Sequence, residues 1–244
     1  MKAMILAAGK GTRLGKITET MPKVLVDING KSLLQLAVEK CALSGFDDII
    51  INVHYFADMV EKEIARLKKM GFRITISDER NKLLETGGGL YNARDFFDSH
   101  SFLLFNADII TDLDLTALFS YHLEKKGLAT LAVRNREGKR YFLINNKGLL
   151  KGWCNKSTGE RIIASENEEL REIAFSGIHV LTPEIFKYMN EGVFTMTGLY
   201  MQLAADHKIH TFLHNKGYWA NVGTPEILEN VRRMLVSGNI NLPG

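Results

Sequence analysis

Cysteine is scarce in this sequence, and its placement excludes several kinds of site. The 244 residues include only Cys41 and Cys154, which lie far apart. Neither belongs to a Cys-x-x-Cys pair, so the chain lacks that redox and zinc-binding motif. Cys41 falls on the apolar face of an expected helix. We therefore expect two reduced thiols with no role in a metal site.

Excess charge and long apolar runs are also missing. The 31 Lys and Arg against 28 Asp and Glu give a formal net charge of only +3. No basic run with interleaved aromatic residues is present, which argues against a nucleic-acid partner. No stretch reaches membrane-spanning length, and the first apolar run is too short for a signal peptide. We expect a cytoplasmic protein without a membrane partner, either a monomer or a small homo-oligomer.

The first half of the chain alternates short apolar runs with segments of helical periodicity. The expected strands are Lys2–Ala7, Asp48–Val53, Phe72–Ser77, Phe102–Asn106 and Leu128–Val133. The first expected helix is capped by Ser32 and ended by Gly45. The other expected helices span Ala57–Met70, Gly88–Phe97 and Leu113–Lys125. This alternation predicts an α/β fold with a Rossmann-like, doubly wound sheet that is mixed but mainly parallel.

The second half reads as shorter strands separated by polar turns. The expected strands are Tyr141–Ile144, Gly148–Cys154, Ile173–Val180, Ile209–His214 and Tyr218–Val222. Helices are expected over 182–188, over 197–206 and from Thr224-Pro225 to Val236, and the charged segment 160–171 is expected to be a mobile loop. We predict one domain over 1–244, with residues 1–134 as its main α/β part and 135–244 as a smaller, strand-rich part.

A glycine loop directly follows the first expected strand. It reads Leu6-Ala7-Ala8-Gly9-Lys10-Gly11-Thr12-Arg13-Leu14, and Pro22-Lys23 follows it closely. Glycines let backbone N–H groups turn toward an anion, and an arginine binds phosphate oxygens in pairs. The loop is neither a dinucleotide fingerprint, which needs a third glycine where Leu14 stands, nor a Walker loop. A plain turn with chance cations is the alternative to a phosphate site.

Three polar segments follow different strands of the expected sheet. The glycine loop follows the first strand, Ser77–Gly89 follows the third, and Asn106-Ala107-Asp108 ends the fourth. Ligands of open parallel sheets bind beyond the carboxyl ends of the strands. We therefore expect one site along this rim, with Asp108 either a metal ligand or a helix cap.

The glycine loop with Pro22-Lys23 resembles the signature of the sugar-1-phosphate nucleotidylyltransferases. The resemblance implies a nucleoside triphosphate and a sugar 1-phosphate as substrates, with Mg²⁺ as the cofactor. It implies catalytic roles for Arg13 and Lys23 and metal ligation by Asp108 and Asn221. The implied nucleotide contacts are Leu6, Ala7, Ala8, Gly9, Gly11, Thr12, Arg13, Thr86, Gly87 and Gly88, and the implied sugar-phosphate contacts are Asn106, Lys156 and Gly177.

Two positions depart from the family pattern. Asn221 stands where the family has the Asp of Trp-x-Asp-x-Gly-Thr, which suggests weaker metal binding, ligation through water or a degraded site. Lys156 follows Asn155 where the family often has Glu-Lys-Pro. A catalytically weak nucleotide-sugar-binding regulatory protein is therefore an alternative. A Rossmann oxidoreductase is a second alternative, disfavoured by the missing third glycine.

The loop Leu84-Glu85-Thr86-Gly87-Gly88-Gly89 indicates the branch within the family. With Ser77-Asp78-Glu79 before it, it looks most similar to the N-acetylmuramate 1-phosphate uridylyltransferases. The mannose-1-phosphate guanylyltransferases are the alternative branch. The resemblance thus implies uridine triphosphate as the nucleotide, with guanosine triphosphate as the alternative.

Overall fold

The structure is a computed structural model that describes residues 1–164 and 169–238. Its strands are β1 (Lys2–Leu6), β2 (Asp27–Ile28), β3 (Lys31–Ser32), β4 (Asp48–Val53), β5 (Arg73–Asp78), β6 (Phe102–Asn106), β7 (Ile109–Thr111), β8 (Ala129–Arg134), β9 (Arg140–Ile144), β10 (Leu150–Asn155), β11 (Glu160–Ile163), β12 (Arg171–Leu181), β13 (Ile209–Leu213) and β14 (Trp219–Asn221).

Its helices cover both faces of the sheet that these strands form. The α-helices are α1 (Ile17–Thr20), α2 (Leu33–Leu43), α3 (Ala57–Lys69), α4 (Glu85–Asn92), α5 (Leu115–Lys125), α6 (Met196–Leu203) and α7 (Pro225–Val236). The 3-10 helices are η1 (Thr12–Leu14), η2 (Lys23–Leu25), η3 (Arg94–Phe96) and η4 (Pro183–Tyr188).

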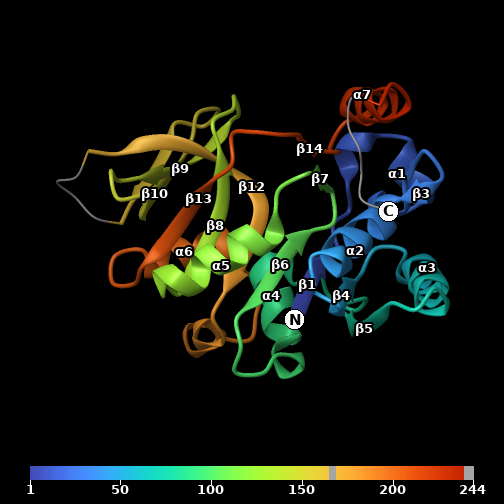
Figure 1. The fold of residues 1–244 in the computed structure, drawn as a ribbon, viewed down its shortest axis with the longest axis horizontal. Helices are drawn as coiled ribbons and strands as arrows, with labels where there is room; N and C mark the ends of the chain where they lie inside the picture. Colours follow the sequence, from blue (N-terminus) through green and yellow to red (C-terminus); the bar gives the residue numbers. More distant parts are fainter. Residues whose placement is uncertain (165–168, 239–244) are drawn as a thin grey trace.

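One mixed sheet of ten strands runs through the described residues (Figure 1). Its order is β11-β10-β9-β12-β6-β1-β4-β5, and β8 joins β12 to β13. Strands β5, β4, β1 and β6 are parallel, whereas β12 is antiparallel to β6 and to β8. The predicted α/β fold with a mixed sheet around a parallel centre is confirmed. The carboxyl ends of its parallel strands share one edge, as expected.

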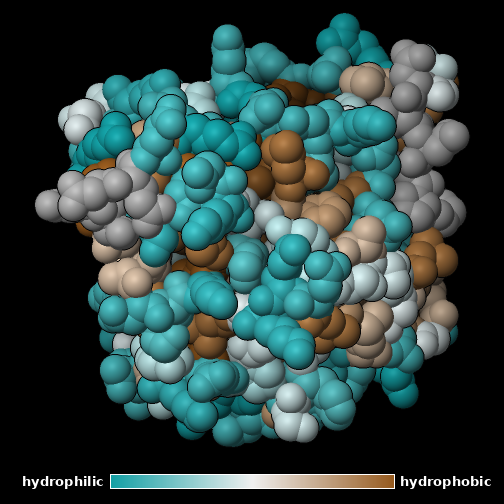
Figure 2. Space-filling view, turned by 60° about the vertical axis from the view of Figure 1, so that its left-hand side comes forward, coloured by the Kyte–Doolittle hydropathy of each residue, from teal (hydrophilic) through white to brown (hydrophobic). Residues whose placement is uncertain are grey.

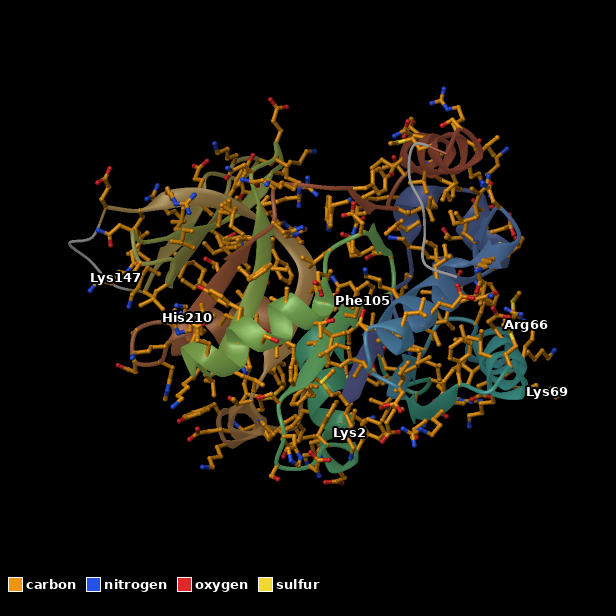
Figure 3. The ribbon with its side chains drawn as sticks, viewed as in Figure 1. Lys2, Arg66, Lys69, Phe105, Lys147 and His210 are labelled. Atoms are coloured by element: carbon orange, nitrogen blue, oxygen red, sulfur yellow. The ribbon has the colours of Figure 1, made fainter. Side chains whose placement is uncertain are left out.

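The central strands are apolar because both of their faces are covered. Ile5, Ile51 and Phe105 are fully buried in β1, β4 and β6. In Figure 3, Phe105 lies at the middle of the molecule, whereas Arg66 and Lys69 extend from α3 at its edge. The face shown in Figure 2 is mainly hydrophilic, with hydrophobic residues in separate patches. Burial of this kind contributes about 25 cal/mol for each Å² of apolar surface removed from water.

Strand β12 links the two parts of the sheet and is irregular in its middle. Its register with β8 shifts between Phe175 and His179. Gly177 lies within this bulge at a φ of +79°, a conformation that glycine adopts without strain. A Cβ there would meet the side chain of Ile109 at 2.9 Å, so the bulge also lets β7 approach closely.

The end of the chain returns to the N-terminal part. Strand β14 pairs antiparallel with β7, aligning Asn221 with Ile109. Helix α7 then packs beside β2, where Arg232 Nη2 donates to the Asp27 carbonyl at 2.7 Å. Figure 1 shows α7 next to α1 and β3. This return brings the last predicted site residue back to the edge at which β6 ends.

The structure corrects the expected loop over 160–171. Glu160–Ile163 forms β11, which pairs antiparallel with β10 after a turn in which Gly159 has a φ of +75°. Charged residues misled the sequence interpretation because edge strands commonly carry charge on their exposed faces. Residues 165–168 of this prediction lie outside the described residues. The helix expected over 182–188 is the 3-10 helix η4, and β7 was not predicted at all.

Candidate functional site

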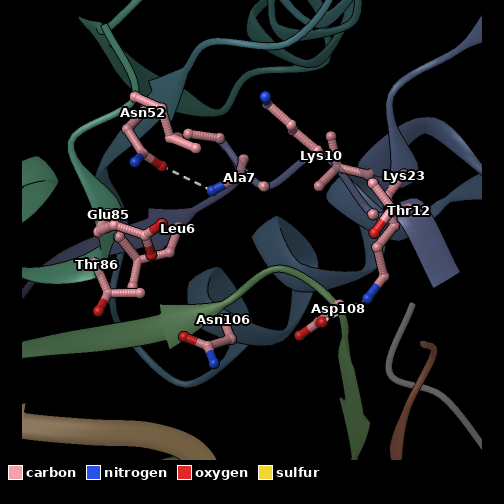
Figure 4. Close-up of a pocket in the computed structure, with 15 residues that line it drawn as sticks. Leu6, Ala7, Lys10, Thr12, Lys23, Asn52, Glu85, Thr86, Asn106 and Asp108 are labelled. Carbon is pink, nitrogen blue, oxygen red and sulfur yellow. Dashed lines mark hydrogen bonds and ion pairs between the residues drawn. The ribbon is translucent and has the colours of Figure 1, made fainter. Parts of the chain in front are cut away.

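A cavity of about 410 Å³ opens at the carboxyl ends of β1, β4 and β6, and we term it the glycine-loop cavity (Figure 4). On one side, Figure 4 shows Lys10, Thr12 and Lys23; Glu85 and Thr86 lie on the other. Its lining residues are Leu6, Ala7, Ala8, Gly9, Lys10, Gly11, Thr12, Lys23, Val24, Asn52, Leu83, Glu85, Thr86, Asn106 and Asp108. The rim at which the sequence predicts a site thus carries an open cavity with Lys10 and Lys23 along one wall.

A second cavity of about 550 Å³ lies along β14, and we term it the β14 cavity. Asn106 lines both cavities, so the two are neighbours. The lining residues of the β14 cavity are Arg13, Asn106, Ile109, Arg136, Phe175, Gly177, Tyr218, Trp219, Ala220, Asn221, Gly223, Thr224, Ile227 and Asn230. Arg13 therefore reaches this second cavity, although it belongs to the glycine loop.

The glycine loop is shaped by contacts with Lys23. Gly11 has a φ of +65°, and a Cβ there would lie 2.6 Å from Lys23 Cβ. Only glycine combines that backbone conformation with such a close approach. The loop therefore lies directly on the aliphatic stem of Lys23. This packing fixes the direction in which the ammonium group of Lys23 points.

Lys23 and Asp108 form an ion pair at the wall of the glycine-loop cavity. Lys23 Nζ lies 2.5 Å from Asp108 Oδ2, and the two side chains are 8% and 23% exposed. The Asp108 carbonyl accepts a hydrogen bond of 2.9 Å from Val222 N, which follows Asn221. The structure thus joins the glycine loop, the end of β6 and the late segment around β14. Sequence reasoning predicted Lys23, Asp108 and Asn221 as site residues, but it did not predict the ion pair between Lys23 and Asp108.

A buried polar network supports the floor of the same cavity. Asn52 Oδ1 accepts a hydrogen bond of 2.7 Å from Ala7 N, and Asn52 Nδ2 donates to Glu79 Oε1 at 2.8 Å. Glu79 Oε2 accepts from Leu84 N at 3.4 Å. Burial raises the pKa of Glu79, since only 3% of the residue is exposed. A Cβ at Gly89 would lie 2.5 Å from Glu79 Oε1, which explains that glycine.

The sequence analysis did not identify Asn52 and Glu79 as site residues. The available signal was Asn52 itself, a single amide inside the otherwise apolar strand β4. A buried amide needs hydrogen-bond partners. Here the partners are Ala7, directly after β1, and Glu79, directly after β5. The network therefore couples the loop after β1 to the loop before α4.

The three glycines at the start of α4 have a different environment from the one expected. The N–H groups of Gly87 and Gly88 both donate to the Phe194 carbonyl, at 2.9 and 3.1 Å. A Cβ at Gly87 would lie 2.4 Å from the Phe194 ring, and one at Gly88 would lie 2.1 Å from the Gly192 carbonyl oxygen. These glycines let α4 pack against the segment before α6. Neither is among the residues that line the glycine-loop cavity, whereas Thr86 is.

Asn106, Gly177 and Asn221 meet in the β14 cavity, together with Arg13. The Asn106 side-chain oxygen is buried and has no hydrogen-bond partner. Gly177 lies against the Asn106 amide, since a Cβ there would be 3.0 Å from Asn106 Nδ2. Four residues predicted from separate motifs are thus brought to one space. A buried acceptor without a partner is a place where a ligand hydroxyl or a water can donate.

Lys156 is a further predicted site residue that lies outside both cavities. Its Nζ pairs with Glu172 Oε2 at 2.5 Å and lies over the Tyr141 ring, and it lines neither cavity. The cation on that side of the β14 cavity is Arg136, which the sequence analysis did not single out. The sequence offered no signal for it, because Arg136 belongs to an exposed-looking polar connection between β8 and β9.

The donor set at the edge of β6 and β14 suits a magnesium ion. Within residues 1–164 and 169–238, no three His, Cys, Asp or Glu side chains gather as a complete metal cage. Mg²⁺ does not need one, because one or two protein oxygens and the phosphates of a substrate suffice. Asp108 supplies a part-exposed carboxylate and Asn221 an amide oxygen on the paired strand. The residues present therefore fit this ion.

The two cysteines are part of the packed interior of the protein. Cys41 and Cys154 are both unpaired and buried, and burial raises the pKa of the Cys41 thiol to about 12. A thiol with so high a pKa is a weak nucleophile at neutral pH. No helix among the described residues is both long and apolar enough to cross a bilayer.

Comparison with known proteins agrees with this geometry. The chain is 29% identical over 232 residues to N-acetylmuramate alpha-1-phosphate uridylyltransferase from Caulobacter vibrioides, covering 92% of each chain. It is also 29% identical to mannose-1-phosphate guanyltransferase from Yarrowia lipolytica, covering 93% of this chain and 61% of that one. The chain thus spans about three-fifths of the yeast relative.

Solved structures share the fold at lower identity. A putative glucose-1-phosphate thymidylyltransferase from Bacillus anthracis superposes with a TM-score of 0.80 at 19% identity, covering 99% of this chain and 96% of that one. Residues 2–237 match the nucleotidyl transferase family, which is nearly the whole chain. This match agrees with the signature in the glycine loop and with the cavity that the loop encloses. The chain belongs to the nucleotidyl transferase family.

Proposed function

We propose that this protein is an enzyme that transfers a nucleotidyl group from a nucleoside triphosphate to a sugar 1-phosphate. The observation that carries the proposal is the pair of neighbouring cavities with Asn106 in both walls. One cavity presents a glycine loop and Lys23 to phosphates, and the other presents Arg13 to a second ligand. Transfer between two ligands needs such adjacent spaces. In this proposal residues 1–134 bind the nucleotide, and residues 135–244 supply most of the sugar site.

The reaction needs positioning and charge compensation more than acid–base chemistry. An oxygen of the sugar phosphate forms a bond to the α-phosphorus while the bond to the bridging oxygen of pyrophosphate breaks. The leaving pyrophosphate takes the electron pair, and no proton has to move, because the attacking oxygen is already ionised at neutral pH. Lys23 and the glycine-loop amides would stabilise the charge that builds up on the transferring group. Arg13 would bind phosphate oxygens at the junction of the two cavities.

Asp108 and Asn221 would hold the magnesium ion. When bound, this ion neutralises phosphate charge and lowers the repulsion between the two anionic substrates. Lys23 currently engages Asp108 Oδ2 at 2.5 Å. Because Lys23 also lines the glycine-loop cavity, it would be within reach of both the carboxylate and the phosphates of a bound nucleotide. Its ammonium group would stay close to the transferring phosphate whichever of these anions it contacts.

The base would bind between the glycine loop and the start of α4. Leu83, Glu85 and Thr86 line that side of the glycine-loop cavity. Thr86 Oγ1 accepts from Met196 N at 2.9 Å, which fixes its position. Because Gly87 and Gly88 direct their amides to Phe194, we assign the base contacts to these three residues and not to the glycine amides.

The preferred substrates would be uridine triphosphate and N-acetylmuramate 1-phosphate. The similarity to the Caulobacter relative supports this pair. Guanosine triphosphate with mannose 1-phosphate is the second candidate, supported by the Yarrowia relative. Uracil and guanine both offer a carbonyl and an N–H on one edge, so the size of the cavity must discriminate between them.

A matrix of nucleoside triphosphates against sugar 1-phosphates, followed by pyrophosphate release, tests the proposal. We expect magnesium-dependent turnover with at least one pair. The competing candidate, a nucleotide-sugar-binding protein with little turnover, is favoured by Asn221 in place of a carboxylate. Tight binding of a nucleotide sugar without turnover of any pair would establish that alternative and exclude the enzyme.

A further inference from the structure

Arg136 is a half-buried cation without an acidic partner. Its Nη2 donates to the Phe175 carbonyl at 3.0 Å and its Nη1 to the Glu137 carbonyl at 3.1 Å, while its Nε has no partner. Among the ion pairs of the described residues, none involves Arg136. Burial lowers the pKa of Arg136, because its charge is poorly solvated in this position. A partly buried guanidinium without an acidic partner gains from an anion that meets its free N–H groups with good hydrogen-bond geometry.

The Trp219 ring holds this guanidinium in a fixed plane. Arg136 Cζ lies 4.5 Å from the centroid of the Trp219 ring. Trp219 is itself anchored, because its Nε1 donates to the Ser176 carbonyl at 2.9 Å. A stacked arginine keeps its planar set of donors in one orientation, which favours recognition of a carboxylate or phosphate. The two carbonyl acceptors leave further N–H groups of Arg136 unused.

The β14 cavity contains a second arginine and no carboxylate. Its described lining includes Arg13 and Arg136 but no Asp or Glu. Arg13 lies near Asn221, since a Cβ at Gly223 would be 3.1 Å from Arg13 Nη2 and 2.8 Å from Asn221 Oδ1. Arg136 lies on Trp219. The cavity thus carries positive charge at two separate places.

The two strand positions beside the cations are spaced by about the width of a sugar ring. Trp219 and Asn221 are two residues apart on β14 and therefore face the same side of the strand, with their backbones about 6.6–6.8 Å from one another. A hexose ring with one substituent on each side spans a comparable length. If the phosphate of the acceptor lies by Arg13 and Asp108, where transfer has to occur, the far side of its ring points toward the part of the cavity that Arg136 lines.

We infer that Arg136 is a specificity-determining residue that binds an anionic substituent of the acceptor sugar, across the ring from the transferred phosphate. This inference rests on the proposed function. It implies that the acceptor is a sugar 1-phosphate that carries a second anionic group. A carboxylate and a second phosphate share the chemistry that Arg136 recognises, and the experiment separates them.

The first test compares acceptors that differ only in the second anion. N-acetylmuramate 1-phosphate and N-acetylglucosamine 1-phosphate differ by a lactyl ether with its carboxylate. Glucose 1,6-bisphosphate and glucose 1-phosphate differ by a phosphate. For the wild-type enzyme we expect kcat/KM to be at least about 10-fold higher for the anionic member of one pair, as for a hydrogen-bonded charge. The preferred pair identifies the anion. Equal kcat/KM within both pairs would overturn the inference.

The second test removes the charge. Arg136→Gln should raise the KM of the preferred anionic acceptor about 10- to 100-fold. It should leave kcat and the KM of the matching neutral acceptor within about 2-fold. Arg136→Lys, which keeps the charge but loses the planar donors, should fall between wild type and Arg136→Gln. The control is Arg140→Gln, because Arg140 is an exposed arginine at the start of β9 that lines neither cavity.

The outcomes separate this inference from the proposed function. An equal loss with anionic and neutral acceptors in Arg136→Gln, or an Arg140→Gln effect of the same size, would refute the role of Arg136 while nucleotidyl transfer stood. No pyrophosphate release with any pair of substrates would refute the proposed function itself. The wild-type comparison needs no variant, so poor folding of Arg136→Gln does not block the test.

Discussion

Replacing Lys23 by methionine separates the charge of this residue from its packing. Methionine keeps an unbranched stem of similar length, so it can still pack beneath Gly11, whose Cβ position lies 2.6 Å from Lys23 Cβ. The substitution removes the ammonium group that lies 2.5 Å from Asp108 Oδ2. The change therefore tests the proposed electrostatic role while leaving the shape of the glycine loop nearly intact.

The expected loss of activity is much larger than the expected loss of stability. Removing one preorganised charge contact to a transferring phosphate costs about 2.7–4 kcal/mol, by analogy with oxyanion donors, which is about 100- to 1,000-fold in kcat. The effect on folding is smaller, because Asp108 is 23% exposed and water can still reach its carboxylate after the lysine charge is removed. We expect a decrease of about 1–2 kcal/mol in the free energy of unfolding, the cost of leaving one partly buried group without its partner.

Initial rates of pyrophosphate release and urea unfolding at the same pH measure the two effects. Lys16→Met is the matched control, because Lys16 is an exposed lysine between η1 and α1 that lines neither cavity. It should leave both quantities near the wild-type values. If Lys23→Met kept a kcat within a few-fold of wild type, or if unfolding explained its whole loss of activity, the proposed role of Lys23 would be wrong.

Four substitutions and a change of pH test other parts of the reasoning. Arg13→Ala should lower kcat/KM at least about 10-fold with an unchanged unfolding transition, and normal kinetics would remove Arg13 from the phosphate site. Asp108→Asn should abolish magnesium-dependent activity, whereas Asn221→Asp should preserve or raise it; weaker magnesium binding by Asn221→Asp in a titration would show that residue 221 is not a ligand. Gly88→Ala should destabilise the fold by about 1–3 kcal/mol in thermal unfolding, because its Cβ would lie 2.1 Å from the Gly192 carbonyl, and an unchanged Tm would contradict that packing. Burial lowers the pKa of His179 to about 3 and the pKa values of His122 and His214 to about 4. The unfolded state therefore binds more protons than the folded state between pH 6.5 and 4, and the free energy of unfolding should fall as the pH drops. The expected decrease at pH 5 is about 2 kcal/mol for each histidine. A free energy of unfolding in urea that stayed constant from pH 7 to 5 would refute this pH dependence.

Local patterns were sufficient for the central sheet and for much of the rim. Apolar runs of strand length predicted β1, β4 and β6, because strands buried on both faces must be apolar. The glycine loop and Asp108 follow directly from those strands, and parallel strands end at the same edge. Their meeting in one cavity is therefore a consequence of connectivity, which the sequence encodes within short segments.

Partners that lie far apart in the chain were decided only by the tertiary structure. The resemblance implied a sugar-phosphate contact for Lys156 despite its altered sequence context, yet in the structure its ammonium group pairs with Glu172 from β12. The amides of Gly87 and Gly88 look available in the sequence, yet the Phe194 carbonyl accepts from both. Hydrogen bonds and ion pairs act over a few ångström, so their choice depends on which distant segments packing brings together.

Arg136 and the Asn52–Glu79 network are residues that the sequence analysis missed, because their partners also lie far away in the chain. No motif marks Arg136, and its significance comes from Trp219, which lies 83 positions later and reaches it only because β14 pairs with β7. Asn52 matters because β1 and β5 both flank β4 and place Ala7 and Glu79 within hydrogen-bond distance. The sequence by itself determined the layers, the rim and the glycine loop, since these depend on local periodicity and connectivity. The tertiary structure decided which charges remain unpaired in the cavities, because that depends on every segment packed around them.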